Sequence, residues 1–297
     1  MAEASPDFHW GKKMIKPFLR GLAAISMMTL SAVVSAGAQT APSLNGQTLP
    51  DYTAPSAGLV GEIKAKGTIV NGIEAQNPPF EYIDNGKIVG FDIDITNKFA
   101  EHLGVKAEFI DTAWSGVIPS LYTKKFDMIW SAMTITEPRK QAVSFSKPYA
   151  SDQVEFIVRA GETRIKEFKD LDGLVLGTQL NSAAEFQAKE MIKTAGIKVE
   201  LKSFDSFQGA YLDLRNGNID AVTSTQLNDR ALFEANKGIF DVAFKLPIYN
   251  YVGVAIRQQD TDLLKEVNAF LDKMIASGEL AELQKKWFGY VMDLPAQ

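Results

Sequence analysis

The stretch SLYTKKFDMIWS (residues 120–131) decides the fold, because DLRNGNIDAVTS (residues 213–224) repeats its pattern in the second half of the chain. The two copies share an aromatic residue, a leucine, an aspartate and a serine at one spacing: Trp114, Leu121, Asp127 and Ser131 in the first, and Phe207, Leu214, Asp220 and Ser224 in the second. Each copy predicts a helix followed by a strand with a polar end. The alternative is a chance likeness of two short βα units. The repeat favours two similar α/β lobes, with both serines facing a shared ligand region at the carboxyl ends of the strands.

The segments around this repeat also alternate between strand and helix patterns, as in an α/β protein. GTIVNGI (residues 67–73) predicts a buried strand, and Asn-Gly within residues 84–87 predicts a hairpin turn. Apolar residues recur every fourth position over residues 91–103, before Gly104, which predicts an amphipathic helix ending there. With 297 residues, 46% of them apolar, the chain has room for two lobes with separate cores.

Composition excludes several kinds of function. The chain has no cysteine, which removes disulfides, thiolate metal sites and cysteine nucleophiles. Its two histidines, His9 and His102, lie far apart in the sequence, which disfavours a histidine metal cage or a Ser-His-Asp triad. The net charge of -5 argues against nucleic acid as a partner. We therefore expect no metal and no cofactor.

The N-terminus reads as a secretory signal peptide in residues 1–38. Four basic residues precede the apolar run of residues 21–34, and Ala-Gly-Ala at residues 36–38 predicts cleavage after Ala38. The alternative, a membrane anchor, is disfavoured because a span needs roughly 20 apolar residues. Met14 is an alternative start. Residues 39–58, rich in Pro, Ser, Thr and Gly, predict a flexible lead-in with no core to bury.

The most site-like segment is SAMTITEPR (residues 131–139). Thr136 suits a helix N-cap and Pro138 the first turn, so a short helix is expected to begin there. Arg139 in that first turn is electrostatically misplaced unless an anion meets it, which predicts a carboxylate-binding guanidinium. The hydroxyls of Ser131 and Thr134 would add donors. The alternative is a surface ion pair between Arg139 and an acid such as Glu137.

Four other positions at predicted strand or helix ends suit a ligand. Trp114 opens a helix and is interpreted as a flat wall, with burial in the core as the alternative. Glu74 follows the first strand and would meet a cationic group, or be an ordinary solvated acid. Asn181 and Ser182 precede a helix and serve as caps or ligand donors.

Ordered motifs along the chain carry a family resemblance. They are PPFEY (residues 78–82), GKIVGFDIDI (86–95), IPSL (118–121), KFDMI (125–129), MTITEPRK (133–140), FSKPY (145–149) and KKWFG (285–289). This order resembles the bacterial extracellular solute-binding proteins of family 3, the polar-amino-acid receptors of ABC importers. The resemblance covers residues 59–289.

The resemblance implies a two-lobe fold with two crossing strands that closes on one ligand. Lobe 1 would comprise residues 59–150 and 250–297, and lobe 2 residues 153–247. The residues that match the family's ligand contacts are Trp114, Ser131, Ala132, Met133, Thr134 and Arg139 in lobe 1, and Leu180, Asn181 and Ser182 in lobe 2. It further implies a periplasmic location, a permease in the inner membrane as partner and a monomeric receptor.

Two departures from the family pattern concern the ligand. Asn77 stands where many members have an aromatic residue, and Thr225 where amino-acid receptors carry the Asp that holds the α-ammonium group. We therefore expect a carboxylate whose nitrogen is substituted, neutral or held elsewhere, for example by Glu74; opines belong to that class. The alternative is an enzyme resembling periplasmic cyclohexadienyl dehydratases, with Glu74 as its acid. A third class, the sensing half of a receptor or channel, needs a membrane span that the sequence does not indicate.

Overall fold

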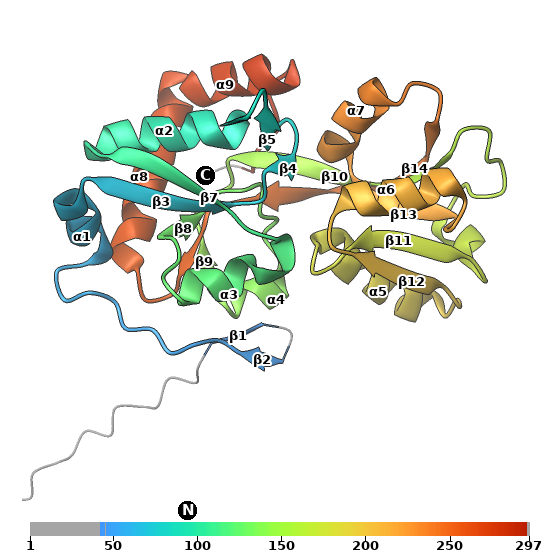
Figure 1. Cartoon of the computed structure of the whole chain (residues 1–297), viewed down its shortest axis with the longest axis horizontal. Coiled ribbons are helices and arrows are strands. Elements are labelled where there is room, and N and C mark those ends of the chain that lie inside the picture. Colours follow the sequence, from blue (N-terminus) through green and yellow to red (C-terminus); the bar gives the residue numbers. More distant parts are fainter. Residues whose placement is uncertain (1–41, 45, 296–297) are drawn as a thin grey trace, which may run out of the picture. The chain divides into compact units, whose positions relative to one another are not determined.

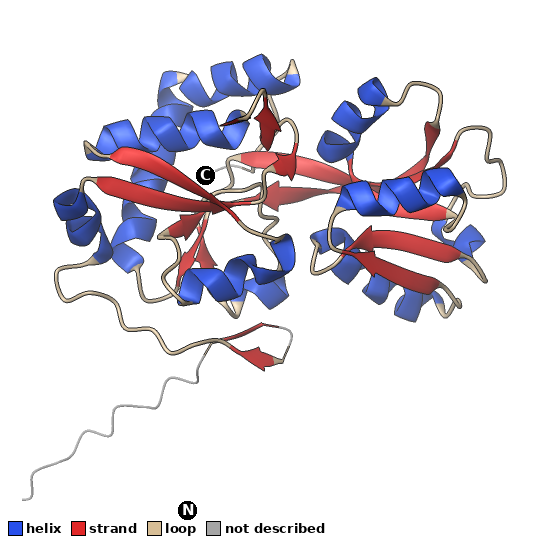
Figure 2. Ribbon diagram, viewed as in Figure 1, coloured by secondary structure: helices blue, strands red, loops and turns tan. Residues whose placement is uncertain are grey.

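The computed structural model describes residues 42–44 and 46–295, so the predicted signal peptide lies outside the described part. Within that part the chain forms two five-stranded sheets, each flanked by helices, and two smaller sheets (Figure 2). This is the α/β architecture with two sheet-containing lobes that the repeat predicts. No helix in the described residues is both long and apolar enough to cross a bilayer.

The sheet of lobe 1 has the strand order β7-β3-β8-β15-β9. Its strands are β3 (Thr68–Ile73), β7 (Lys106–Asp111), β8 (Met128–Ile129), β9 (Val143–Phe145) and β15 (Ala255–Arg257). β3 runs parallel to β7 and β8, whereas β15 is antiparallel to both β8 and β9, between which it lies. The C-terminal segment therefore completes this sheet.

Helices pack on both faces of the lobe 1 sheet (Figure 1). They are α1 (Leu59–Lys66), α2 (Phe91–Leu103), α3 (Val117–Tyr122), α4 (Glu137–Lys140), α8 (Thr261–Ser277) and α9 (Glu279–Phe288), with a 3₁₀ turn at Trp114–Gly116. The predicted apolar stripe of α2 is buried against Trp130 and Phe270, and Gly104 ends the helix in a left-handed conformation, with φ 74°. The predicted amphipathic helix is confirmed.

A small antiparallel sheet lies between β3 and α2 in the chain. It consists of β4 (Gln76–Asn77), β5 (Glu81–Asp84) and β6 (Lys87–Val89). Asn85 and Gly86 join the last two strands with φ values of 49° and 75°, the left-handed pair that a tight hairpin requires. The Asn-Gly turn is thus where the sequence predicts it.

The sheet of lobe 2 has the order β12-β11-β13-β10-β14. Its strands are β10 (Ala150–Arg159), β11 (Val175–Gln179), β12 (Glu200–Phe204), β13 (Ala221–Thr225) and β14 (Phe240–Val252), and its helices are α5 (Ala183–Ala195), α6 (Phe207–Asn216) and α7 (Gln226–Ala235), with a 3₁₀ turn at Phe168–Leu171. β10 and β14 pair antiparallel along their length, beginning with Ala150 opposite Val252, and they join the two lobes (Figure 1).

The internal repeat has the same structural role in both lobes. Asp127 accepts a hydrogen bond from the Val70 backbone N–H at 2.8 Å and donates its own N–H to the Val70 carbonyl. Asp220 makes the same two bonds to Val175, with 3.0 Å for the side-chain bond. Each aspartate thus ties the start of its own strand to the neighbouring parallel strand, at the third residue of β3 and at the first residue of β11. The likeness of the two stretches is therefore structural, not accidental.

The lead-in packs on lobe 1, contrary to the expectation that it buries nothing. Beyond a small hairpin of β1 (Ser43–Leu44) and β2 (Gln47–Thr48), Leu49 is buried in a cluster with Tyr122. The Tyr52 ring lies 4.4 Å from the buried guanidinium of Arg257, and its hydroxyl donates to Asp260 at 2.6 Å. The physical reason is that these two large side chains cover an apolar surface and an internal ion pair.

Candidate ligand-binding site

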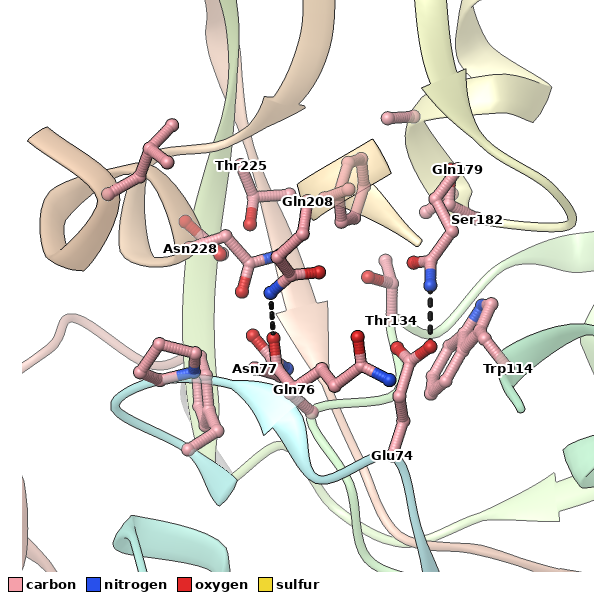
Figure 3. A pocket seen from close by; sticks show the side chains of 18 of the residues that line it. Glu74, Gln76, Asn77, Trp114, Thr134, Gln179, Ser182, Gln208, Thr225 and Asn228 are labelled. Atoms are coloured by element: carbon pink, nitrogen blue, oxygen red, sulfur yellow. Dashed lines mark hydrogen bonds between the residues drawn. The ribbon is translucent and has the colours of Figure 1, made fainter. Parts of the chain in front are cut away.

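A cavity of about 260 Å³ lies between the two lobes, at the carboxyl ends of strands from both sheets (Figure 3). Its polar lining comes from Glu74, Gln76, Asn77, Trp114, Thr134 and Arg139 in lobe 1, and from Asp152, Gln179, Ser182, Gln208, Thr225 and Asn228 on lobe 2 and its crossing strand. Strand β3 leads to Glu74, β11 ends at Gln179 and β13 ends at Thr225. The chain thus places its cavity where open α/β sheets bind ligands.

Arg139 brings a buried positive charge to this cavity. It stands in the short helix α4, whose N-cap Thr136 accepts the Arg139 N–H at 3.4 Å, as the sequence predicts. The side chain is only 2% exposed, and its guanidinium donates to the carbonyls of Thr134 at 2.9 Å and Asn181 at 3.0 Å. Burial lowers the pKa of Arg139 to about 10.

No carboxylate in residues 42–44 and 46–295 forms an ion pair with Arg139. The alternative partner, Glu137, is exposed and pairs instead with Lys140 at 2.7 Å. A guanidinium has five N–H donors, and the two carbonyl bonds use two of them. Donors and charge therefore remain for an anion, and a ligand carboxylate matches both.

Trp114 forms one wall beside Arg139. Its ring centroid lies 5.2 Å from the guanidinium carbon, and its Nε1 donates to the Asn181 carbonyl at 3.2 Å. The same ring packs at the edge of the lobe 1 core. Trp114 is thus both a wall of the cavity and a partly buried core residue, so the two interpretations of this tryptophan are compatible.

Glu74 is a buried acid, not a solvated one. It is 7% exposed, lines the cavity and accepts a hydrogen bond from Gln179 Nε2 of lobe 2 at 2.7 Å (Figure 3). Burial raises the pKa of Glu74 to about 7, against the opposing hydrogen bond from Gln179. Its carboxyl group therefore bridges the lobes and is available to a cationic group in the cavity.

Asn77 also lines the cavity, and its side-chain oxygen is a buried acceptor without a donor among the described residues. Its Nδ2 donates to Glu81 at 3.1 Å, whereas its Oδ1 is buried and has no partner among the described residues. A polar ligand group with an N–H or O–H donor would satisfy this oxygen.

Four predicted contact residues lie outside the cavity lining. Ser131 is fully buried, accepts the Glu74 N–H at 3.1 Å and donates to Glu81 at 2.9 Å, so it positions Glu74. Met133 packs in the lobe 1 core, Leu180 points to the surface with 36% exposure, and Asn181 offers its carbonyl to Trp114 and Arg139. These four residues are not among those that line the cavity, and their contacts with a ligand stay a prediction.

Ala132 lines the cavity, but its backbone donor is already used. Its N–H donates to the buried Asp92 at 2.6 Å, and Asp92 also accepts the Tyr149 hydroxyl at 2.9 Å. Burial raises the pKa of Asp92 to about 7, and a neighbouring carboxyl group, Glu81, lies against it. The predicted Ala132 donor therefore fixes the loop and is not open to a ligand. Thr134 lines the cavity as predicted.

Lobe 2 supplies hydroxyl and amide groups. Ser182 lines the cavity and caps helix α5 by accepting the Glu185 N–H at 3.0 Å. Thr225 stands at the N-cap position of α7 without capping it, and hydrogen-bonds instead to Asp152. Gln208 Nε2 donates to the Gln76 carbonyl of lobe 1 at 2.5 Å (Figure 3).

Asp152 is the functional candidate that sequence reasoning missed. It lies on β10, lines the cavity and is 7% exposed. The antiparallel register sets Val154 opposite Thr225, which brings Asp152 to the start of helix α7. No local motif marks it, because its place depends on a pairing between strands about 70 residues apart in sequence. In the described residues no three His, Asp or Glu side chains come together as a metal site.

Comparison with known proteins agrees with this arrangement. The model of the bacterial extracellular solute-binding proteins, family 3, matches residues 69–290. The chain is 33% identical to the L-cystine-binding protein TcyJ of Escherichia coli (strain K12), over 78% of this chain and 86% of that protein. It is 34% identical to the L-arginine-binding protein of Pseudomonas aeruginosa, over 74% of this chain and 87% of that protein.

Two solved structures are similar over more than three quarters of the chain. The P235GK mutant of ArgBP from T. maritima matches with a TM-score of 0.71 and 38% identity, over 77% of this chain and 99% of that one. The ancestral amino acid-binding protein AncCDT-1, a precursor of cyclohexadienyl dehydratase, matches with a TM-score of 0.70 and 35% identity, over 78% of this chain and 100% of that one.

Proposed function

The chain belongs to the bacterial extracellular solute-binding proteins of family 3, and from that premise we propose that it is the periplasmic receptor of an ABC importer. Its ligand is a small amino acid or amino-acid derivative with a carboxylate group. The observation that carries this proposal is the buried guanidinium of Arg139, which faces the cavity with no acid as partner in the described residues. Named relatives that bind cystine and arginine support the class.

In this proposal the ligand carboxylate meets Arg139 against the Trp114 ring. Thr134 and Ser182 add hydroxyl groups from the two lobes, and Glu74, bonded to Gln179, holds donor groups at another side of the cavity. Because the lining comes from both lobes, the site is complete only when the lobes converge. The converged form is the one that the permease in the inner membrane would recognise, with the receptor acting as a monomer.

Lobe closure has a direct test in solution. Saturating ligand is expected to lower the radius of gyration measured by small-angle X-ray scattering, because residues such as Arg139 and Ser182 can enclose a small molecule only by approaching each other. The Arg139→Ala variant, measured at the same ligand concentration, should keep the larger radius. Superimposable curves for the wild type with and without ligand would contradict closure.

For the ligand class, we propose an opine-like conjugate. Thr225 is a neutral hydroxyl, and by itself it offers no negative charge to compensate the desolvation of a primary ammonium. The lining also holds five amide side chains, which suit the polar appendage of a conjugate better than an apolar side chain: Gln76, Asn77, Gln179, Gln208 and Asn228.

A thermal-shift screen tests both the receptor function and this class. Octopine is expected to raise the melting temperature of the wild type by more than the twenty standard amino acids do at equal concentration. Thr225→Asp should narrow the gap in Kd between octopine and arginine by about tenfold, since the new carboxylate can pair with a primary ammonium. Thr163→Asp, at an exposed site outside the cavity, is the control.

A separate activity assay distinguishes a receptor from an enzyme. Because the chain is similar to AncCDT-1, a precursor of cyclohexadienyl dehydratase, the alternative function is a dehydratase with Glu74 as its acid. Purified protein is expected to leave prephenate and arogenate unchanged, and turnover lost in Glu74→Gln would favour the enzyme. Tight binding of a standard amino acid by the wild type would contradict the opine-like class while keeping the receptor.

A further inference from the structure

The cavity contains a buried carboxylate with no cationic partner. Asp152 is 7% exposed, and no Lys or Arg in the described part of the chain forms an ion pair with it. Two other buried acids, Glu155 and Asp229, interact electrostatically with Asp152, and Glu155 is itself paired with Lys245 at 2.5 Å. Burial raises the pKa of Asp152 to about 7, as expected for a carboxylate that lacks a counter-charge.

The hydrogen bonds of Asp152 leave it few acceptor sites. Its Oδ1 accepts the backbone N–H groups of Gln153 at 2.8 Å and of Leu227 at 3.2 Å, and the Thr225 side chain also hydrogen-bonds to the carboxylate. A carboxylate has about four lone-pair sites, so about one site remains for a ligand. The Leu227 bond also places the negative charge at the N-terminus of helix α7, where the helix dipole favours it.

A second unused acceptor lies in the first turn of helix α7. Asn228 lines the cavity, and its Oδ1 is buried without a partner in the described residues. Figure 3 shows Asn228 and Thr225 on the same side of the cavity, with Asn77 on the other side. The crossing strand and the start of α7 therefore each present one acceptor residue to the cavity, and one of the two is charged.

We propose that Asp152 and Asn228 bind the protonated nitrogen of the ligand, and that this nitrogen is a secondary ammonium. The inference rests on the proposed receptor function and assigns its cationic subsite. A secondary ammonium has two N–H donors, which match the two acceptors, and it has the positive charge that Asp152 lacks. A primary ammonium has a third N–H, which this pair of acceptors leaves unpaired. Thr225 acts indirectly, by orienting the Asp152 carboxylate.

The test compares three probes that share an arginine skeleton. Octopine has a secondary ammonium, L-arginine a primary one, and Nα-acetyl-L-arginine a neutral amide. Calorimetry with the wild type is expected to give the order octopine, arginine, acetylarginine from tightest to weakest. Asp152→Asn keeps an oxygen for the Gln153 and Leu227 bonds and removes the charge. It should weaken octopine binding on the order of 30-fold and leave acetylarginine within about threefold.

Two further variants guard against a folding artefact. Asn228→Leu keeps the size of the side chain, removes the acceptor and should weaken octopine more than acetylarginine. Glu155→Gln is the matched control, since Glu155 is a buried acid on the same strand outside the cavity lining, and it should leave all three affinities within about threefold. Circular dichroism is the check that each variant is folded.

The outcomes separate the subsite from the function. Equal affinity for the three probes, lost in Arg139→Ala but unchanged in Asp152→Asn and Asn228→Leu, would keep the receptor function and overturn the subsite. An equal loss for all three probes in Asp152→Asn would likewise overturn it, because a general structural effect does not discriminate by nitrogen charge. Binding of no probe at millimolar concentration would count against both.

Discussion

Replacing Arg139 with alanine is expected to weaken ligand binding by about 2–5 kcal/mol, the range for truncating one partner of a buried charge pair. The guanidinium is buried and is held by two backbone carbonyls, so its position is fixed before the ligand carboxylate arrives. Without it, the carboxylate would be desolvated beside the Trp114 ring with no charge to meet it. The expected loss is much larger than that for any hydroxyl group of the lining.

Calorimetry on the wild type and the variant measures this loss with the tightest ligand of the screen. Lys140→Ala is the matched control, because Lys140 is the next residue, is about half exposed and pairs only with Glu137 among the described acids. Its affinity should stay within about twofold of the wild type. If the affinity of Arg139→Ala also stayed within about twofold of the wild type, Arg139 would not be a ligand-binding residue.

The buried guanidinium of Arg139 is expected to lower the free energy of unfolding of the ligand-free protein. Burial lowers the pKa of Arg139 from its ordinary value to about 10, so folding disfavours the charged form. At neutral pH, below both the folded and the unfolded pKa, this penalty is fully present. Arg139→Met should therefore melt at the wild-type temperature or above it while losing binding, as expected of a residue kept for function.

Replacing Asp260 with alanine is expected to destabilise the fold by about 3–5 kcal/mol, because it leaves a buried guanidinium unpaired. Asp260 is fully buried, and its carboxylate accepts from Arg257 Nε at 2.5 Å and from the Tyr52 hydroxyl at 2.6 Å. Arg257 is 2% exposed and keeps its carbonyl partners in the variant, including Leu121 at 2.7 Å. Hydrogen bonds of that kind satisfy its donors but do not neutralise its charge.

Urea unfolding of ligand-free protein gives the free-energy change directly. Asp272→Ala is the control: this half-exposed acid pairs with Lys147, and exposed pairs contribute at most about 1 kcal/mol. A loss in Asp260→Ala no larger than that of the control would show that the Arg257–Asp260 pair contributes little. Tyr52→Phe, which removes only the hydroxyl, should fall between the two.

The features that the sequence predicts well are those with a local physical cause. Asn85-Gly86 forms its turn because both residues tolerate positive φ, and helix α2 follows from its period of apolar residues. The equivalent roles of Asp127 and Asp220 are recognisable because both halves of the chain carry the same residue types at the same spacing. Arg139 is identifiable because a cation in the first turn of a helix is unusual without an anion.

The features that cannot be predicted from the sequence depend on contacts between segments that are distant along the chain. Asp152 enters the cavity through the register of β10 against β13, and Leu49 and Tyr52 find an apolar surface that only the folded lobe presents. The Ala132 donor is taken by Asp92, a buried acid whose position no motif around residue 132 reveals. Sequence identifies candidate donors, but tertiary packing decides which of them remain open.

The position of β15 in the lobe 1 sheet determines the order in which the molecule can assemble. Strand β9 has β15 as its only sheet partner among the described strands, and β15 follows all of lobe 2 in the chain. The ends of the lobe 2 segment lie together, with Ala150 opposite Val252, so that lobe can form from one continuous stretch. A chain emerging from its N-terminus can therefore complete the lobe 2 sheet first. The lobe 1 sheet is completed only when β15 pairs with β8 and β9, which are distant from it in the sequence. Strand β9, which follows the helix of Arg139, therefore joins its sheet only in that late step.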